Sequence, residues 1–391
     1  MGKRVMLIFG TRPEAIKMAP VALAMRADPD IEPIICVTAQ HRQMLDQVLR
    51  IFDLTPDIDL NVMQPGQDLH DVTARIIVGL RDVLRAEHPD LVLVHGDTTT
   101  CLSAALAAFY QNIAIGHVEA GLRTFDLSAP FPEEANRSLV GRIANLHFAP
   151  TTKAAQNLLL ENIPAEHIHV TGNTVIDALL LARDKLGALP AGHWRETLGA
   201  ALVDAVATHE RLILITGHRR ENFGQGFLNF CKAIQRLAAS HPNWLFVYPV
   251  HLNPNVQKPV YDLLQGLANV MLVSPLDYLP FVWLMDRSDL ILTDSGGIQE
   301  EGPALGKPVL VMRNVTERPE AVEAGTARLV GTDSTAIIDA VEQLLQDDVL
   351  YRSMAEAKNP YGDGHASERI LRIILDSSRE NPSRNLEVHR A

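Results

Sequence analysis

Residues 289–308 read Asp-Leu-Ile-Leu-Thr-Asp-Ser-Gly-Gly-Ile-Gln-Glu-Glu-Gly-Pro-Ala-Leu-Gly-Lys-Pro. The apolar run Leu290–Leu292 is typical of a strand that is buried on both faces of a parallel sheet. The Gly-Gly pair at 296–297 lacks the side chains that would keep a ligand away from the backbone. A helix then runs to Gly306, with a proline two residues beyond, and both residues favour a stop. The stretch predicts a strand, a tight turn and a helix in direct succession.

The turn in this stretch has two interpretations. A strand that enters a helix through Ser-Gly-Gly leaves backbone N–H groups unpaired, and the helix dipole adds partial positive charge there, so a phosphate would bind well. Glu300 and Glu301 lie one turn further on, where a carboxylate could accept hydrogen bonds from sugar hydroxyls. Alternatively, the glycines serve only a turn that needs a positive φ. The stretch alone does not favour one interpretation over the other.

Strand-length apolar runs alternate with helical stretches along most of the chain. The expected strands are 4–9, 33–38, 90–95, 113–118, 145–149 and 167–170, then 211–216, 244–250, 269–273, 289–293, 308–312 and 327–330. The expected helices include 13–26, 41–51, 69–86, 99–110, 152–161, 225–239 and 297–305. This alternation predicts parallel sheets that are covered by helices on both faces. The strands are too many for one compact sheet, so two sheets are expected.

The series of strands breaks after Thr171-Gly172-Asn173-Thr174, where an Ala/Leu-rich segment without a strand follows. We therefore predict an α/β fold with two Rossmann-like parallel-sheet domains, residues 1–173 and 174–365, that face a central cleft. A C-terminal helix over 366–378 could cross back to the first domain. The polar tail 379–391 is expected to be frayed.

Composition narrows the class of protein. The chain has 391 residues, 47% of them hydrophobic, and a formal net charge of −12, which disfavours nucleic acid and anionic membranes as partners. Its three cysteines, Cys36, Cys101 and Cys231, are far apart and form no Cys-x-x-Cys motif, as expected for a reduced cytoplasmic protein. No apolar run approaches the roughly 18 residues of a membrane span. The N-terminus begins with a strand rather than a signal peptide.

Polar side chains follow most of the expected strands. In open α/β sheets, ligands bind at the carboxyl ends of the strands. Histidines occur at positions 95, 117, 147, 218 and 251, one to a strand end, which is not the short spacing of a metal site. His95 and His117 are more simply explained as core histidines. The sequence has no phosphate loop of the Gly-x-x-x-x-Gly-Lys-Ser/Thr type. Gly224-Gln225-Gly226 begins a dinucleotide fingerprint, but Asn229 stands where its last glycine is required. We therefore expect neither a metal nor another cofactor.

Acidic and basic groups separate between the two halves. The carboxylates Asp97, Glu119, Glu133 and Glu134 fall in the first half. The groups suited to phosphate, His218, Arg219 and the Ser295–Gly297 turn, fall in the second. This division predicts that one half transfers protons and the other holds a nucleotide.

Eight motifs carry a resemblance to a known family. They are 9–17 (Phe-Gly-Thr-Arg-Pro-Glu-Ala-Ile-Lys), 94–100 (Val-His-Gly-Asp-Thr-Thr-Thr), 116–124 (Gly-His-Val-Glu-Ala-Gly-Leu-Arg-Thr), 132–137 (Pro-Glu-Glu-Ala-Asn-Arg), 216–222 (Thr-Gly-His-Arg-Arg-Glu-Asn), 293–301, 316–320 (Thr-Glu-Arg-Pro-Glu) and 359–364 (Asn-Pro-Tyr-Gly-Asp-Gly). With them, residues 3–378 closely resemble the bacterial non-hydrolysing UDP-N-acetylglucosamine 2-epimerases. That family has the two-domain fold of type B glycosyltransferases, in agreement with the two predicted sheets.

The resemblance implies reversible conversion of UDP-N-acetylglucosamine to UDP-N-acetylmannosamine, for bacterial surface polysaccharide synthesis. C2 of the sugar lies beside no carbonyl, so its proton is not acidic enough for direct removal. Transient oxidation would need NAD, whose fingerprint is absent. Elimination of UDP to 2-acetamidoglucal and its re-addition needs only a base, an acid and a clamp on the diphosphate. A cytoplasmic homodimer is a further family expectation.

The resemblance also assigns roles to individual residues. Asp97, Glu119 and Glu133 resemble the proton-transfer carboxylates, and His218 the group beside the diphosphate. The residues that resemble substrate contacts are Arg12, Lys17, Phe281, Ser295, Gly296, Gly297, Glu301 and Arg318. Many members bind a second UDP-N-acetylglucosamine as activator, and part of that site is resembled by Gln40, Gln43, Arg219 and His251. The sequence departs from the family pattern at Leu276, where some members carry Gln, and at Gly66, where one has Arg.

Three other functions remain open at the level of sequence. A hydrolysing 2-epimerase would release free N-acetylmannosamine and UDP. A glycosyltransferase of the same fold would require an acceptor. A non-catalytic UDP-sugar sensor would bind the substrate without turning it over.

Overall fold

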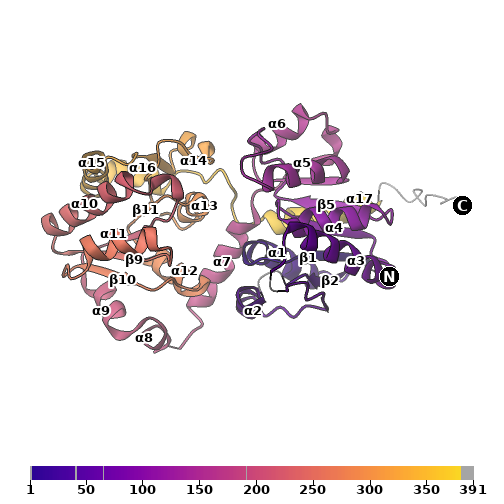
Figure 1. Ribbon diagram of the computed structural model, residues 1–391, viewed down its shortest axis with the longest axis horizontal. Helices are drawn as coiled ribbons and strands as arrows, with labels where there is room; N and C mark the ends of the chain where they lie inside the picture. The colour runs from indigo at the N-terminus through magenta and orange to yellow at the C-terminus, as the bar shows by residue number, and fades with distance from the viewer. Residues whose placement is uncertain (1, 40–41, 65, 191, 380–391) are drawn as a thin grey trace, which may run out of the picture. The chain divides into compact units, whose positions relative to one another are not determined.

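The computed structural model describes residues 2–39, 42–64, 66–190 and 192–379, with the backbone alone at 42, 43, 378 and 379. The chain divides into two compact units (Figure 1). Unit 1 comprises residues up to Ala178 together with those from Gly362 onward, and unit 2 is Leu179–Tyr361. The sequence-based boundaries, 173/174 and 365/366, lie a few residues from these points.

Unit 1 is built on a seven-stranded parallel sheet of order β3-β2-β1-β4-β5-β6-β7. Its strands are β1 (Lys3–Phe9), β2 (Ile31–Val37), β3 (Ile58–Asp59), β4 (Leu91–His95), β5 (Ala114–Val118), β6 (Leu146–Ala149) and β7 (Ile168–Val170). Its helices are α1 (Arg12–Arg26), α2 (Arg42–Ile51), α3 (Leu69–Glu87), α4 (Thr99–Phe109), α5 (Glu133–Ile143), α6 (Thr152–Leu160) and α17 (Ala366–Arg379), with a 3₁₀ turn η1 (Ala165–His167). Buried aliphatic side chains of β1, β4, α3 and α4 form its core.

Unit 2 is built on a six-stranded parallel sheet of order β10-β9-β8-β11-β12-β13. Its strands are β8 (Arg211–Thr216), β9 (Trp244–Pro249), β10 (Val270–Val273), β11 (Leu290–Thr293), β12 (Val309–Val311) and β13 (Ala327–Leu329). Its helices are α8 (His193–Leu198), α9 (Ala200–Thr208), α10 (Gln225–Ser240), α11 (Pro254–Leu264), α12 (Tyr278–Arg287), α13 (Gly296–Ala304), α14 (Pro319–Glu323), α15 (Ser334–Gln346) and α16 (Asp348–Ala355), with a 3₁₀ turn η2 (Arg220–Asn222). The helix α7 (Thr174–Leu186) runs across the boundary between the units.

The expected pair of parallel-sheet α/β domains is confirmed. Every strand expected from the sequence is present, with ends within two residues of the expected ones. The sequence did not indicate β3, because a strand of two residues is too short to show a hydrophobic period. Among the described residues, no helix is both long and apolar enough to cross a membrane.

Each sheet has one point at which the strand order reverses direction. In unit 1 this point lies between β1 and β4, and in unit 2 it lies between β8 and β11. The loops that leave two neighbouring parallel strands at such a point run to opposite faces of the sheet, which opens a crevice at their carboxyl ends. Topology therefore singles out the segments that follow β1 and β4 in unit 1, and those that follow β8 and β11 in unit 2.

The chain returns to unit 1 through α17, which packs against α1. In Figure 1 the yellow α17 lies among the indigo and purple elements of unit 1. The buried Asp177 at the start of α7 accepts hydrogen bonds from the backbone N–H of Ala366 (3.2 Å) and Ser367 (2.7 Å). Because this carboxylate caps α17, the first turn of α7 belongs to unit 1, and the observed boundary lies beyond residue 173.

Candidate functional site

A buried glutamate connects the two strand ends at the reversal point of unit 1. Thr11 caps α1, and Glu14 completes the capping box by accepting from the backbone N–H of Thr11 at 2.8 Å and of Gly10 at 3.1 Å. The other carboxylate oxygen of Glu14 accepts from the hydroxyl of Thr98, which caps α4 behind β4. Glu14 therefore ties the end of β1 to the end of β4 across the reversal point.

Glu119 lies directly after β5, and three polar groups surround its carboxylate. Lys17 of α1 forms an ion pair with it, and the side-chain amide of Asn173 donates to Oε1 at 2.9 Å. His95 Nε2 lies 3.5 Å from Oε2. Glu119 adopts a left-handed backbone conformation, with φ of +62°, which is strained for a residue with a side chain. Such strain concentrates at functional sites.

Asp97 follows β4 and is held from α5. Asn136 donates to the carbonyl of Asp97 at 2.8 Å, and Arg137 Nη1 lies 3.3 Å from the Asp97 carboxylate. Burial, together with the negative charge of Glu119, raises the pKa of Asp97 to about 6, although Arg137 opposes the rise. A carboxyl with a pKa near neutrality can both take and return a proton.

The positive charge of Arg137 is shared with a second carboxylate. Glu134 is buried, and it accepts from Arg137 Nε at 2.6 Å and from the backbone N–H of Thr124 and Phe125 at 3.0 and 2.9 Å. Burial alone would raise the pKa of Glu134, but these donors outweigh it and lower the pKa. Glu134 thus pairs with the same guanidinium group that faces Asp97.

The remaining expected groups of unit 1 occupy helix starts or the core. Arg12 and Glu133 are partly buried at the first positions of α1 and α5. Burial lowers the pKa of His95 and of His117 to about 4, so both rings are neutral at pH 7. The ring of His117 lies 2.7 Å from the carbonyl of Gly96. Within the described ranges, no group of three or more His, Cys, Asp or Glu residues could hold a metal ion.

In unit 2 the reversal point brings the turn of residues 289–308 against the loop after β8. Ser295 precedes α13, and its backbone N–H donates to Thr293 Oγ1 at 2.9 Å. Among the described residues, the N-cap residue Ser295 makes no side-chain hydrogen bond to the first turn of α13. Helix-start N–H groups without a cap can bind a ligand instead. A Cβ added at Gly296 would lie 3.6 Å from the guanidinium of Arg219. The same Cβ would lie 3.6 Å from a carboxylate oxygen of Glu317, so the charge of Arg219 is partly balanced there. The turn and Arg219 form the candidate anion site of unit 2.

Several charges gather around this anion site. Arg219 lies 3.6 Å from Glu317, and a Cβ added at Gly296 would lie 3.9 Å from the guanidinium carbon of Arg318. Arg318 is paired with Glu300, which is buried within α13. Burial would raise the pKa of Glu317, but the surrounding arginines, foremost Arg313, lower it.

The other groups expected in unit 2 lie on the loops and helices around this turn. His218 stacks on the exposed His251, with ring centroids 5.3 Å apart and planes inclined at 15°. Glu301 accepts from the hydroxyl of Tyr278 at 3.5 Å, and a Cβ added at Gly297 would lie 3.8 Å from its carboxylate. Tyr278 begins α12, and Phe281 is partly buried one turn further along this helix.

The structure therefore gathers most of the expected groups into two sets, one in each unit. Gln40 lies outside the described residues, and so does the side chain of Gln43. The residues that hold the expected groups in place were not recognised in the sequence as functional. They are Glu14, Arg137, Asn173 and Asp294. Glu134 and Glu300 also hold such groups, but the sequence had suggested other roles for them, in proton transfer and in sugar binding.

Comparison with known proteins gives a consistent result. The family model described as UDP-N-acetylglucosamine 2-epimerase matches residues 23–375. The chain is 58% identical over 374 residues to the UDP-N-acetylglucosamine 2-epimerase of Salmonella typhimurium, covering 95% of this chain and 98% of that one. It is similar to the crystal structure of UDP-GlcNAc 2-epimerase from Neisseria meningitidis bound to UDP-GlcNAc, with a TM-score of 0.85, 52% identity and coverage of 95% and 100%. The Methanocaldococcus jannaschii UDP-GlcNAc 2-epimerase in complex with UDP-GlcNAc and UDP gives a TM-score of 0.75, 34% identity and coverage of 95% and 99%.

Proposed function

The chain belongs to the UDP-N-acetylglucosamine 2-epimerase family, and on that premise we propose that it interconverts UDP-N-acetylglucosamine and UDP-N-acetylmannosamine without net hydrolysis. The observation that carries the proposal is the pair of carboxylates Asp97 and Glu119 at the crevice of unit 1. Asp97 has a pKa raised to about 6, and Glu119 is held in a strained conformation by Lys17 and Asn173.

The proposed route is elimination followed by re-addition. A base removes the C2 proton while the C1–O bond breaks, and the C–H electron pair becomes the C1=C2 double bond of 2-acetamidoglucal. The electrons of the broken C1–O bond leave with UDP. A proton is then delivered to the opposite face of C2, and an oxygen of the diphosphate attacks C1. The overall reaction needs no redox partner, and it requires two proton-transfer groups.

Asp97, Glu119 and Glu133 are the candidates for proton transfer. A buried carboxyl whose pKa is close to the working pH is effective as both base and acid. Lys17 neutralises Glu119 and, with Arg12, could stabilise the negative charge that develops on the departing diphosphate.

Unit 2 would bind UDP. The uncapped start of α13, with Arg219 and Arg318 close to Gly296, suits the diphosphate, and His218 would lie beside it. Glu301 would accept hydrogen bonds from the ribose hydroxyls, and Phe281 and Arg318 would make further contacts with UDP. Departing UDP held in this way remains available for re-addition to the glycal.

Three further expectations from the family remain proposals. We propose a second UDP-N-acetylglucosamine as activator near Gln40, Gln43, Arg219 and His251, a homodimer, and a role in surface polysaccharide synthesis in the cytoplasm. Sigmoidal substrate dependence that Gln43→Ala abolishes, with catalysis retained, would support the activator. Sedimentation would test the dimer.

Isotope exchange in heavy water tests the proposed reaction. The protein is incubated with UDP-N-acetylglucosamine in D₂O, and the recovered UDP-sugars are analysed by NMR. We expect deuterium at C2 in both epimers. Free N-acetylmannosamine and UDP as the main products would instead identify a hydrolysing enzyme. Turnover only with an added acceptor would identify a glycosyltransferase, and binding without exchange would identify a sensor.

A further inference from the structure

Asp294 lies at the reversal point of unit 2, between the end of β11 and the start of α13. Its side chain is 0% exposed. It accepts from the backbone N–H of His218 at 2.9 Å, from that of Arg219 at 2.9 Å, and from the side-chain amide of Asn222 at 3.2 Å. All three donors belong to the loop that follows β8. Asp294 therefore ties that loop to the strand that carries the Ser295–Gly297 turn.

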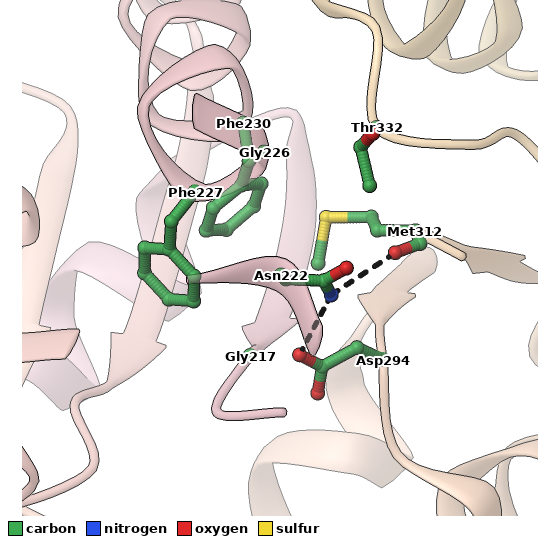
Figure 2. A pocket seen from close by; sticks show the side chains of 8 residues that line it. All are labelled: Gly217, Asn222, Gly226, Phe227, Phe230, Asp294, Met312 and Thr332. Atoms are coloured by element: carbon green, nitrogen blue, oxygen red, sulfur yellow. Dashed lines mark hydrogen bonds between the residues drawn. The ribbon is translucent and has the colours of Figure 1, made fainter. Parts of the chain in front are cut away.

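Figure 2 shows how Asn222 completes this arrangement. Its amide nitrogen lies between Asp294 and the carbonyl of Met312, to which it donates at 3.2 Å. Beyond it lies a cavity of about 10 Å³, lined on its apolar side by Phe227 and Phe230 of α10. A cavity of this size holds one water molecule at most. Asp294 is buried and so shielded from bulk solvent, and its hydrogen bonds are therefore strong.

The carboxylate also acts on the ring of His218. Asp294 Oδ1 lies 3.7 Å from His218 Nδ1. Burial lowers the pKa of His218, and the charge of Asp294 opposes this, while His251 and Arg219 add to the lowering. Within the described part of the chain, Asp294, His251 and Arg219 are the titratable groups that act on the ring. A neutral side chain at 294 would leave burial, His251 and Arg219 unopposed.

We infer that Asp294 is a positioning residue, which fixes His218 and Arg219 in register with the turn at the start of α13. The inference rests on the proposed function, because it assumes that this turn holds the diphosphate. Three well-oriented donors on one buried carboxylate hold a loop far more rigidly than the loop's own backbone would. Asp294 itself is covered by the loop and makes no contact with the substrate in this proposal.

A purely structural carboxylate at the other end of the same strand provides a matched control. Asp289 precedes β11 and accepts from the backbone N–H of Leu212 at 2.7 Å and from Arg211 Nη1 at 3.2 Å. It joins the same pair of strands, β8 and β11, at the end that lies opposite to the turn. Asp294→Asn and Asp289→Asn thus remove the same charge from the same strand.

The kinetic test compares the two variants in the full chain. We expect Asp294→Asn to lower kcat about 100-fold, because an amide nitrogen placed against N–H donors displaces the loop, while the Kd for UDP in calorimetry changes less than about tenfold. Asp289→Asn should lower the melting temperature and leave kcat within about twofold. Equal kcat values for the two variants would overturn the inference. If Asp294→Asn does not fold, Asn222→Ala removes one donor and should lower kcat about tenfold without that difficulty.

A second measurement does not depend on turnover. In protein with labelled histidine, the ring signal of His218, assigned with His218→Gln, is titrated by NMR with and without UDP. Asp294→Asn should lower the pKa of His218 and alter its response to UDP, whereas Asp289→Asn should change neither. An unchanged His218 titration in Asp294→Asn would overturn the inference even if the wild-type protein proved not to be an epimerase. Failure of deuterium exchange in the wild type, with the expected NMR result, would overturn the proposed function alone.

Discussion

Asp97 shows how one residue can favour function at the expense of stability. Its pKa is raised from 3.8 to about 6 in the folded protein, so the folded state keeps a proton that the unfolded chain has lost between these pH values. Folding stability therefore declines as the pH rises through this window and is constant above it. An ionised Asp97 costs the fold up to about 3 kcal/mol at neutral pH.

The first prediction follows from this loss of stability with rising pH. Asp97→Asn should abolish epimerisation but increase the free energy of unfolding by about 2–3 kcal/mol at pH 8 and by about half as much at pH 5. Urea titrations at both pH values measure the difference, and calorimetry with UDP checks that unit 2 is intact. A variant less stable than the wild type at pH 8 would contradict the raised pKa. Loss of UDP binding would place Asp97 among the binding groups.

The reach of sequence reasoning at this scale is illustrated by Asp97 and its partners. The position of Asp97, directly after an apolar strand, marked it as a candidate from pattern alone. Its partner Arg137 is 40 residues away in the sequence, and Asn173 is 54 residues from Glu119. Such contacts depend on the order of strands in the sheet, which a single sequence does not specify. Strand ends could therefore be predicted, but their supporting residues could not.

At the scale of elements, α5 controls the charge around Asp97 through consecutive residues. Asn136 holds the backbone of Asp97, and Arg137 divides its charge between Asp97 and Glu134. The helix α5 was not named among the helices expected from the sequence. Pro130-Phe131-Pro132 before it is typical of a loop, and only a short apolar stripe follows. The function of this helix depends on its partners rather than on its own pattern.

The second prediction concerns Glu134 on α5. Glu134→Gln removes the charge that compensates Arg137, so the full positive charge of Arg137 would act on Asp97 and lower its pKa. The acid limb of kcat/KM, near pH 6 if Asp97 is the base, should move down by roughly 0.5–1 pH unit. Stability should fall by about 1–3 kcal/mol, because the N–H groups of Thr124 and Phe125 lose a charged acceptor.

Glu161→Gln is the control for this change. Glu161 accepts two hydrogen bonds from Arg123, at 2.6 and 2.9 Å, and it does not contact Asp97. Glu161→Gln should lower the free energy of unfolding about as much as Glu134→Gln does, and it should leave the acid limb of the kcat/KM profile in place. Equal displacement of the limb in both variants would show that it reports general destabilisation and not the pKa of Asp97.

At the scale of the whole molecule, the two units share one structural feature at the reversal points of their sheets. Each sheet has one reversal point, and in each a buried carboxylate bridges the two loops that leave it. Glu14 joins the ends of β1 and β4 in unit 1, and Asp294 joins the loops after β8 and β11 in unit 2. Sequence could predict two sheets from the number of strands. It could not predict where each sheet reverses, and hence not which acidic residues would be bridges.

Continuity of the chain leads to the last prediction. Unit 2 is one uninterrupted segment, whereas unit 1 needs α17 from the far end of the chain. Ile370 and Ile374 of α17 are fully buried, and each contributes about 1.5–3 kcal/mol by burial. Without α17, unit 1 loses about 3–6 kcal/mol from these two side chains, a large fraction of the roughly 5–15 kcal/mol that stabilises a typical domain. Asp177 also loses the N–H donors of Ala366 and Ser367.

Fragment 174–361, which keeps α7 whole, should therefore fold alone and bind UDP with a Kd within about tenfold of that of the full chain. Fragment 1–178 should show no cooperative thermal transition by circular dichroism, and adding a peptide of residues 362–391 should restore one. Neither fragment should exchange deuterium into the UDP-sugar, because the proton-transfer groups and the UDP contacts are on different fragments. A cooperative transition in 1–178 alone would mean that α17 is dispensable to unit 1. An unfolded 174–361 would mean that unit 2 depends on the rest of the chain for its stability, despite having its own sheet and core.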